Sequence, residues 1–471
     1  MASTVISITH PLARRIGDVA DGLGTDVYVV GGYVRDVLLG LDDADLDIVV
    51  LGDGIAFARA VAERIGIHPV VAFERFGTAM LPWEGGKVEF VGARTEAYTE
   101  GTRKPEVRAG SLHDDLRRRD FTINAMAASL NAGTFGQLID PLGGQKDLRS
   151  RLLRTPLEPE ATFAEDPLRM LRAVRFASQL DFRVASAALA AIRAMKDRLA
   201  IVSQERVTEE FLRLLRGARP SVGIRLMFET GLLDHVFPEI AEMAGVDQRR
   251  EHHHKDVFLH TLQVVDNLAQ SSDNLWLRFA ALVHDIGKPR TKAFQEGAGW
   301  TFHGHEEVGA RMLKRIFRRM RLPMAPLPYV EKLTRLHLRP MVLVDEAVTD
   351  SAVRRLVFEA GEDIEDLMAL CRADITSKNP VLVARYLRNY EVVMEKVGDV
   401  IEKDRLRSWQ PPVRGDEIMA VCGILPGPRV GRLKKAIETA ILDGRIPNDH
   451  DAALTYLLSI KDTTPQDPEP P

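Results

Sequence analysis

The stretch VYVVGGYVRDVLLG at residues 27–40, followed by DLDIVVL at residues 45–51, decides the fold of the N-terminal part of the chain. A short β-branched run ends in two glycines, and the apolar spacing after them is helical. The pattern predicts a strand, a tight turn and an amphipathic helix. Backbone N–H groups in such a turn, at the N-terminus of a helix, suit phosphate oxygens. The sequence therefore predicts an anion cradle at Gly31 and Gly32.

A carboxylate pair follows this turn. Asp45 and Asp47 lie two residues apart on the next predicted strand, so both side chains project from one face. Such pairs hold divalent metals, which activate an attacking hydroxyl and neutralise a leaving pyrophosphate. Glu89, on the alternating strand 87–91, is a candidate third carboxylate. The alternatives are an acid-rich hairpin turn for the pair and a solvated strand position for Glu89; the glycine turn favours a metal site.

Length and composition limit the class of protein. At roughly 150 residues per domain, 471 residues indicate about three domains. The chain is 45% apolar and 28% charged, and it contains no apolar run long enough for a membrane helix. We therefore expect no membrane association, and the N-terminus lacks the pattern of a secretion signal. Two cysteines, Cys371 and Cys422, exclude a disulfide framework and favour a reducing cytoplasm.

The charge balance bears on nucleic-acid binding. With 63 Lys and Arg residues against 67 Asp and Glu residues, the net charge is −4, which excludes a uniformly basic surface. Any RNA would have to be bound by local patches. Up to about residue 155, short β-branched runs alternate with glycines. From residue 158 onward the apolar spacing is mostly helical, so the whole chain reads as α+β.

The glycine turn and the Asp pair resemble the opening motif of bacterial-type (class II) tRNA nucleotidyltransferases and bacterial poly(A) polymerases, a branch of the DNA polymerase beta superfamily. Four later stretches resemble the following motifs of that family in order: residues 115–126, 140–148, 163–172 and 203–211. Together these motifs make a specific match. The resemblance implies a nucleotidyltransferase head with a DNA polymerase beta-like mixed sheet, followed by all-α regions.

The resemblance also implies a division of the chain. We expect a catalytic head at 1–155, a helical neck with the base-selecting motif and RNA binding at 156–246, and an HD phosphohydrolase-like domain at 247–380. A C-terminal helical region would follow at 381–471, with a disordered Pro-rich tail at 463–471. Residues 99–105 fall where the family has a flexible loop that helps to switch specificity; an ordinary exposed loop is the alternative.

Nucleotide binding needs cations around a triphosphate, and Arg118 and Arg119 are candidates. By resemblance, the second motif contacts the sugar and triphosphate. The alternative, that Asp120 and Asn124 cap a helix with Phe121, Ile123 and Met126 on its apolar face, is compatible with this interpretation. The nucleotide-binding residues that we carry over from the family are Gly31, Gly32, Arg35, Arg118, Arg119, Asp120, Asn124, Glu165, Asp166 and Arg169.

Base selection is expected from Asp166 and Arg169, which would share one face of a helix at spacing i, i+3. Aspartate accepts hydrogen bonds and arginine donates them, so the pair matches the amino donor and ring-nitrogen acceptor of both cytosine and adenine. Guanine and uracil would leave two mismatched buried groups. Glu165 would orient Arg169. The alternatives are a capping box from Thr162 to Glu165 and a helix that starts at Asp166.

A second metal centre is expected in the helical part. His260, the doublet His284-Asp285, and Asp374 resemble the ligand pattern of HD-domain metal-dependent phosphohydrolases, and a buried His-Asp doublet requires ligation or pairing. The extra ligand candidates for a binuclear site are His303, His305 and His337. The implied side activity is hydrolysis of phosphoesters, with a transition metal or Mg²⁺; a domain that has lost its metal and serves as a scaffold is the alternative.

RNA-binding candidates lie in two places. Residues 311–321 predict an amphipathic basic helix, whose charged face either binds phosphates or is simply solvated. A second track runs along the neck. The candidates are Arg172, Arg175, Arg206, Arg311, Lys314, Arg315 and Arg318.

Together, the motifs predict an enzyme that adds C, C and A to the tRNA 3′ end from CTP and ATP. Asp45 and Asp47 would bind Mg²⁺ in the head. The alternatives are a poly(A) polymerase, an enzyme that adds only A, and, from a different class, an HD phosphohydrolase whose head merely binds RNA. The oligomeric state is not predictable from the sequence.

Overall fold

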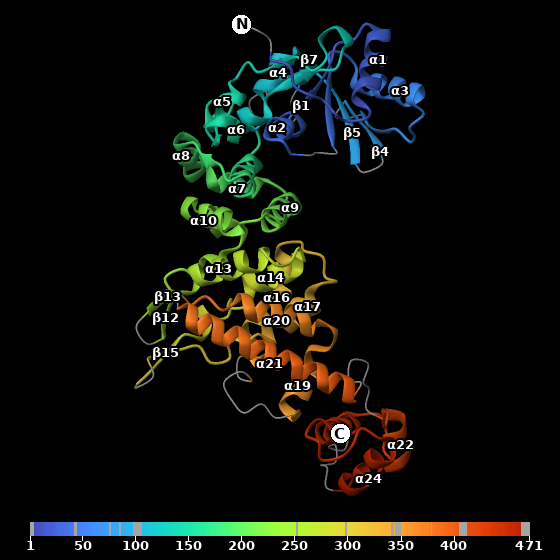
Figure 1. The fold of residues 1–471 in the computed structure, drawn as a ribbon, viewed down its shortest axis with the longest axis vertical. Helices are drawn as coiled ribbons and strands as arrows, with labels where there is room; N and C mark the ends of the chain where they lie inside the picture. Colours follow the sequence, from blue (N-terminus) through green and yellow to red (C-terminus); the bar gives the residue numbers. More distant parts are fainter. Residues whose placement is uncertain are drawn as a thin grey trace, which may run out of the picture. The chain divides into compact units, whose positions relative to one another are not determined.

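The glycine turn follows a strand and starts a helix, as the sequence predicts. The computed structural model describes residues 4–41, 45–74, 77–83, 86–97, 106–250, 253–296, 299–340, 343, 350–377, 379–404 and 412–462. The predicted loop at 99–105 and the predicted tail at 463–471 lie outside these residues. The chain forms two compact units, residues 1–214 with 222–236, and residues 215–221 with 237–471 (Figure 1).

A seven-stranded sheet organises the first unit. Its strands, in spatial order, are β3 (Val71–Phe73), β4 (Thr78–Trp83), β5 (Gly86–Gly92), β2 (Leu46–Val50), β1 (Val27–Val30), β8 (Ala127–Ser129) and β9 (Leu138–Ile139). Strands β2 and β5 are parallel, and all other neighbours in this sheet are antiparallel. The sheet is therefore mixed, as expected, and the parallel pair aligns Asp47 with Glu89.

Helices cover this sheet and continue beyond it. Helices α1 and α3 pack together beside the sheet (Figure 1). The helices of this part are α1 (Ala13–Leu23), α2 (Gly32–Leu39), α3 (Gly54–Ile65), α4 (Leu112–Arg117), α5 (Gly144–Arg149), α6 (Pro159–Glu165), α7 (Leu168–Leu180), α8 (Ser186–Met195), α9 (Gln204–Leu215), α10 (Pro220–Thr230) and α11 (Leu232–Val236). Two short pairs complete it, antiparallel β6 (Arg94–Ala97) with β7 (Glu106–Ala109), and parallel β10 (Leu152–Leu153) with β11 (Arg183–Val184).

Where the structure describes the second unit, it is helical apart from two short antiparallel hairpins. The hairpins pair β12 (Asp247–Arg250) with β13 (His253–Asp256) and β14 (Ala293–Gln295) with β15 (Gly299–Thr301). Its helices are α12 (Pro238–Ala241), α13 (Val257–Ala269), α14 (Leu275–Val283), α15 (Lys288–Thr291), α16 (His305–Arg319), α17 (Leu327–Leu336), α19 (Asp350–Ala360), α20 (Ile364–Ala373), α21 (Pro380–Asp404), α22 (Gly415–Cys422), α23 (Pro428–Leu442) and α24 (His450–Ile460). The last three helices share a small apolar core of their own. The α+β fold class predicted from the sequence is confirmed.

Within the described ranges, none of the helices is both long enough and apolar enough to span a bilayer.

Candidate active site and metal centre

At the end of β1, the backbone of Gly31 lies close to the Asp47 carboxylate and the Arg119 guanidinium. Its φ of 75° and ψ of −131° lie in a region that side chains avoid. A Cβ placed there would lie 2.9 Å from a guanidinium nitrogen of Arg119 and 3.6 Å from Oδ2 of Asp47. Real Cβ atoms do not approach a neighbour to 2.9 Å, whereas 3.6 Å is an ordinary contact, so a side chain at position 31 would require Arg119 or the turn to shift.

The predicted carboxylates lie on adjacent strands. Asp47 is the register partner of Glu89, and Oδ1 of Asp45 accepts a hydrogen bond of 3.1 Å from the Lys87 backbone N–H. The Lys87 ammonium forms an ion pair with Glu89. Loss of solvation and the charges of Glu89 and Asp45 raise the pKa of Asp47, despite the opposing charges of Arg119 and Lys87. Three carboxylates thus surround one ammonium, and such hard oxygen ligands suit Mg²⁺.

The predicted nucleotide-binding residues of α2 and of the second motif form one polar network. Arg35 donates to both carboxylate oxygens of Asp36, at 2.8 and 2.6 Å, and to Oδ1 of Asn124 at 2.8 Å. Asn124 donates to Oδ1 of Asp120 at 3.0 Å, and Arg172 holds Oδ2 at 2.6 and 2.8 Å. The helix-capping alternative for Asp120 and Asn124 is wrong, because residues 122–124 form a short 3₁₀ turn.

Burial would raise the pKa of Asp120, but the charge of Arg172 and the hydrogen bonds from Asn124, Arg172 and the Phe121 N–H outweigh it and lower that pKa. Asp120 is therefore a buried carboxylate that stays ionised. It fixes the orientation of Asn124 and Arg172 around it.

Three arginines line a pocket of about 250 Å³ beside the carboxylates. Its lining residues are Val91, Asp115, Arg118, Arg119 and Arg169. Arg119 is held by Oδ2 of Asp115 at 3.0 and 3.1 Å, and Arg169 donates to the carbonyl of Arg118 at 2.6 Å. Guanidinium groups fixed in this way present positive charge without needing to reorganise, which suits a polyphosphate.

The base-selecting residues are arranged differently from the prediction. Helix α6 ends at Glu165 and α7 begins at Leu168, so Asp166 precedes the helix that carries Arg169. The prediction of one shared helix face is wrong, because Pro167 separates the two helices. The predicted capping box is also absent, because Glu165 is the last residue of α6. The other alternative, a helix start at Asp166-Pro167, is off by one residue: α7 begins at Leu168 with Pro167 as its N-cap, and Oδ1 of Asp166 accepts from the Leu168 N–H at 3.1 Å.

Glu165 orients Arg169, as predicted. Its Oε2 accepts from Nη1 of Arg169 at 2.7 Å, and the same nitrogen reaches the Thr162 carbonyl at 3.2 Å. Asp166 is bonded through Oδ2 to Arg206 of α9, at 2.9 Å. Arg169 is thus held on two sides at the arginine-lined pocket.

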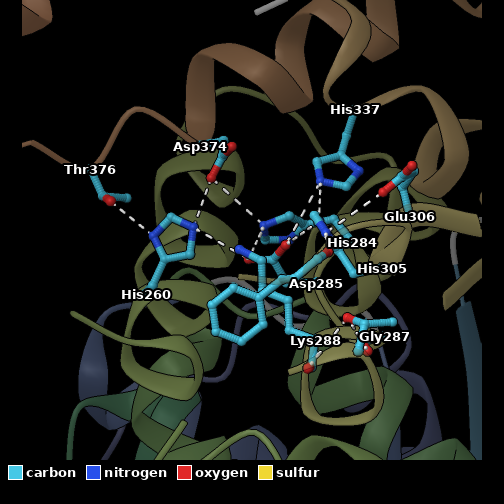
Figure 2. A network of polar contacts seen from close by, with 12 residues as sticks. His260, His284, Asp285, Gly287, Lys288, His305, Glu306, His337, Asp374 and Thr376 are labelled. Atoms are coloured by element: carbon cyan, nitrogen blue, oxygen red, sulfur yellow. Dashed lines mark hydrogen bonds and ion pairs between the residues drawn. The ribbon is translucent and has the colours of Figure 1, made fainter. Parts of the chain in front are cut away.

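The predicted second metal centre is assembled from five helices or their ends (Figure 2). Oδ2 of Asp285 lies 3.2 Å from Nε2 of His284 and 3.8 Å from Nε2 of His260. Oδ1 of the same carboxylate lies 3.2 Å from Nε2 of His305 and 3.7 Å from Nε2 of His337. Asp285 therefore faces two groups of ligands, one with each oxygen.

Asp374 completes the first group. Its Oδ1 lies 2.8 Å from Nε2 of His260 and 3.6 Å from Nε2 of His284. Two sets of side chains have donor atoms close enough to hold one ion each: His260, His284 and Asp285, and Asp285, His305 and His337. His303, the other extra candidate, is exposed and belongs to neither set.

Backbone carbonyls fix the histidine rings of this centre. Nδ1 of His284, His305 and His337 lies 2.7–2.8 Å from the carbonyls of Ala281, Phe302 and Thr334. A proton on Nδ1 leaves the Nε2 lone pair directed at the ligand cluster. Burial and the nearby His284 lower the pKa of His337 to about 3, so its ring is neutral. Within the described part of the chain, Nε2 of His284 and Oδ1 of Asp285 are buried without a hydrogen-bond partner.

This donor set fits a pair of divalent ions bridged by Asp285. Imidazole nitrogens with carboxylates suit first-row transition metals. Burial would raise the pKa of Asp285, but His284 and Lys288 outweigh it and lower that pKa well below its usual value. The carboxylate is thus charged and able to bridge.

Three family descriptions match the chain. They are a poly A polymerase head domain at residues 27–154, a probable RNA and SrmB-binding site of polymerase A at 181–243, and an HD domain at 257–379. An A-adding tRNA nucleotidyltransferase of Deinococcus radiodurans is 35% identical, over 90% of this chain and 93% of the relative. The chain belongs to the tRNA nucleotidyltransferase and poly(A) polymerase family. It is a nucleotidyltransferase with an HD domain, as the motifs predict.

Other members of this family differ in the reaction that their names describe. A CC-adding tRNA nucleotidyltransferase of Thermus thermophilus is 33% identical, over 91% of this chain and 92% of the relative. A multifunctional CCA protein of Nitrosococcus oceani is 35% identical, over 75% of this chain and 85% of the relative. A solved tRNA nucleotidyltransferase complexed with a primer tRNA and an incoming ATP analog is 26% identical, with a TM-score of 0.58 over 82% of this chain and 99% of that one.

The neck arginines of this nucleotidyltransferase are committed to ion pairs. Arg175 is buried and donates to Oε2 of Glu210 at 2.6 Å, and Arg172 holds Asp120. The guanidinium groups of Arg35, Arg172 and Arg175 lie 4.0–5.3 Å from the ring centre of Phe176. RNA binding by Arg172, Arg175 and Arg206 stays a prediction, while their internal pairs give them a structural role.

The basic helix is amphipathic, as predicted. Its apolar side chains are buried, namely Met312, Leu313, Ile316 and Phe317 of α16, with Met320 directly after it. Arg311 pairs with Glu307 at 2.8 Å, and Arg315 lies 4.0 Å from the buried Glu239. Lys314 and Arg318 are exposed. RNA binding by these four residues stays a prediction.

Sequence reasoning missed several partners of the site residues. Lys87 could have been found, since it lies on the same strand face as Glu89. Lys288, whose ammonium lies 2.6 Å from Oδ2 of Asp285, stands one helical turn after that ligand. Asp115 and Glu210 lie within the motif stretches 115–126 and 203–211, but their pairing with Arg119 and Arg175 was missed, because tertiary packing decides which arginine each carboxylate meets.

Proposed function

We propose that this enzyme adds C, C and A to the 3′ end of tRNA, using CTP and ATP and releasing pyrophosphate. The observation that carries the proposal is the fixed Arg169 at a pocket lined by three arginines, next to the carboxylates of β2 and β5. Relatives named for A addition, CC addition and multifunctional CCA activity support the tRNA substrate.

Within this proposal the head residues have separate roles. Asp45, Asp47 and Glu89 would hold Mg²⁺, which supplies charge neutralisation and lowers the pKa of the primer 3′-hydroxyl. Arg118 and Arg119 would bind the triphosphate together with N–H groups of the first turn of α2, which begins at Gly32. The Gly31 N–H, which the sequence places in the same cradle, instead donates to the Met126 carbonyl at 3.3 Å. Arg35, Asp120 and Asn124 orient the sugar side of the nucleotide. Asp166 and Arg169 read the base.

Addition of A alone, of CC alone, and a poly(A) tail are the rival outcomes. The assay uses purified protein and tRNA that lacks its 3′ end, with CTP alone, with ATP alone, and with both. Two additions of C followed by one of A support the proposal. A long A tail, or addition that needs a primer already ending in CC, would overturn it.

Base selection has its own test. Asp166→Ala and Arg169→Ala should lose the preference for CTP and ATP over UTP and GTP while remaining folded. Arg193→Ala is the matched control, since Arg193 is an exposed arginine of the same unit, on α8. Unchanged nucleotide preference in both site variants would remove these residues from base reading.

We further propose that the HD centre binds two divalent transition-metal ions and hydrolyses phosphoesters. His260, His284, Asp374 and Oδ2 of Asp285 would hold one ion, and His305, His337 and Oδ1 of Asp285 the other. These ions would activate water and neutralise phosphate charge. The orphaned buried atoms His284 Nε2 and Asp285 Oδ1 support this proposal.

Metal counting tests the bridging arrangement. Wild-type protein reconstituted with Mn²⁺ or Ni²⁺ should carry two ions by elemental analysis, His337→Gln about one, and Asp285→Asn close to none. Equal metal content in wild type and Asp285→Asn would exclude a bridging carboxylate. Two bound ions without phosphodiesterase activity would leave a structural metal centre.

The predicted division of the chain, with boundaries at 155, 246 and 380, is part of this proposal, as is a cytoplasmic location. A phosphohydrolase with a head that only binds RNA is disfavoured, because both Asp carboxylates and the arginine-lined pocket are present.

A further inference from the structure

Three side chains form one row along α7. Arg169, Arg172 and Phe176 are spaced at i, i+3 and i+7, so they share one face of the helix. The first of them, Arg169, lines the pocket of the arginines, and the last, Phe176, is buried. At 1.5 Å per residue, Phe176 lies about 10 Å further along the helix than Arg169.

Each member of this row contacts the second motif. The first donates to the carbonyl of Arg118 at 2.6 Å, and the second donates to Oδ2 of Asp120 at 2.6 and 2.8 Å. The ring of the third meets the buried ring of Phe121 edge-on, with ring centres 5.9 Å apart. Helix α7 is therefore fitted to the second motif in one register. A shift at its Phe176 contact would also move Arg169.

The ring of Phe176 also lies among three guanidinium groups. Its centre is 5.2 Å from that of Arg35, 5.3 Å from that of Arg172 and 4.0 Å from that of Arg175. Their carboxylate partners are those of Asp36, Asp120 and Glu210. An aliphatic side chain could fill a buried position, but only an aromatic ring also attracts cations through its negatively polarised face. The surroundings of Phe176 thus favour a ring over a simple apolar filler.

These contacts close a loop between α2 and α7. Arg35 of α2 donates to Asn124, Asn124 donates to Asp120, and Arg172 of α7 holds Asp120. Phe176 contacts both ends of this chain, Arg35 and Arg172. The helix that starts at the glycine turn and the helix that carries Arg169 are therefore joined at one ring.

We propose that Phe176 is a positioning residue of the nucleotide site. It holds Arg35 and fixes the register of α7, and so determines where Arg169 lies in the pocket. Phe176 lies beyond residues 163–172, the stretch that resembles the base-selecting motif. The inference rests on the proposed roles of Arg35 and Arg169 in nucleotide binding, and it adds a residue that determines base specificity without touching the base.

The preference for the correct nucleotide over UTP tests this inference. Full-length protein with Mg²⁺ is assayed on tRNA that lacks its 3′ end, with CTP or UTP, and on tRNA that ends in CC, with ATP or UTP. Phe176→Leu should lower the ratio of kcat/KM for CTP or ATP to kcat/KM for UTP roughly 5- to 30-fold, and raise KM for CTP and ATP by a similar factor. Phe176→Tyr keeps the ring and should retain most of the preference.

Phe57→Leu is the matched control. Phe57 is a buried aromatic residue of the same unit, on α3, and its ring pairs with that of Phe90 at 5.8 Å. Phe90 and the neighbouring Glu89 point to opposite faces of the sheet. Phe57→Leu should therefore leave the preference unchanged. A loss of folded protein lowers kcat for every nucleotide by the same factor and does not alter the ratio, so the ratio separates positioning from stability.

The inference and the proposed function fail in different ways. An unchanged ratio in Phe176→Leu would overturn the inference, as would an equal fall in Phe57→Leu or in Phe176→Tyr. Wild-type protein that adds only A, only C or a long A tail overturns CCA addition, and the ratio for the nucleotide that it does use still tests Phe176. If wild-type protein uses UTP equally well, base reading is overturned. KM then decides, and an unchanged KM in Phe176→Leu rejects the inference.

Discussion

Replacing Gly31 by alanine tests whether the glycine turn serves the active site rather than the fold. Gly31→Ala places a Cβ at a positive φ of 75°, which costs about 1–3 kcal/mol of backbone strain. The same Cβ would lie 2.9 Å from the Arg119 guanidinium, which Asp115 holds in place. Either the turn or Arg119 must shift, and a displacement of about 1 Å near the reacting groups costs on the order of 100-fold in rate.

Gly40→Ala is the matched control. Gly40 ends the same helix with a φ of 71°, and a Cβ there would meet nothing within 4 Å. Gly40→Ala should lose about 1–2 kcal/mol of stability by urea denaturation, the cost of an alanine in the αL conformation. Gly31→Ala should lose at least as much, because its ψ of −131° lies outside the αL region and its Cβ also meets Arg119. Only Gly31→Ala should also lose nucleotidyl transfer, about 100-fold in kcat/KM at saturating Mg²⁺. Equal activity of the two variants would refute the argument that the close approach at Gly31 positions Arg119 and Asp47.

Three further predictions follow from charged groups. Arg278 is buried and donates to five backbone carbonyls. Arg278→Met should therefore lower the free energy of unfolding by about 3–5 kcal/mol in a urea titration. The control Arg193→Met, at an exposed arginine, should lower it by no more than about 0.5 kcal/mol. If Glu89 holds Mg²⁺ as proposed, the Lys87 ammonium competes with the ion, so Lys87→Gln should lower the Mg²⁺ concentration for half-maximal activity about 2- to 5-fold. A rise would show that the ammonium itself assists the reaction. The pKa of Asp120 is lower in the folded protein than its unfolded value of about 3.9. Its ion pair therefore stabilises the fold above a pH of about 3.9, and this stabilisation is lost as the pH falls through the folded pKa. The free energy of unfolding of the wild type should thus fall more steeply with acid than that of Asp120→Asn.

Much of the catalytic head was predictable because its signals are local. A β-branched run, two glycines and an alternating Asp pair determine β1, α2 and β2 within a few residues of each other. The register that places Asp47 opposite Glu89 was not predictable. It depends on which strands pair, and the parallel partner of β2 lies about forty residues further along the chain.

In the HD centre, too, the sequence did not determine which of the candidate residues come together. Four ligands could be named by resemblance, yet the choice among His303, His305 and His337 needed the structure. His305 starts α16 and points inward, whereas His303 stands on the exposed turn before it. A shift of two residues at a helix start changes the face that a side chain occupies, and spacing alone does not resolve it.

The ion pairs of the arginines rank the predicted RNA contacts of this chain, whose net charge is −4. Arg175 pairs with the buried Glu210, which also lies 3.8 Å from Arg172 and 3.6 Å from Arg213. Moving Arg175 to a phosphate would break a buried ion pair, at a cost of up to about 3–5 kcal/mol. Arg311 pairs with Glu307 at the surface, where exchange of partners costs no more than about 1 kcal/mol. Lys314 and Arg318 are exposed beside it on the same helix. Phosphate contacts are therefore favoured on α16 over the buried part of the neck, even though both segments look equally basic in the sequence.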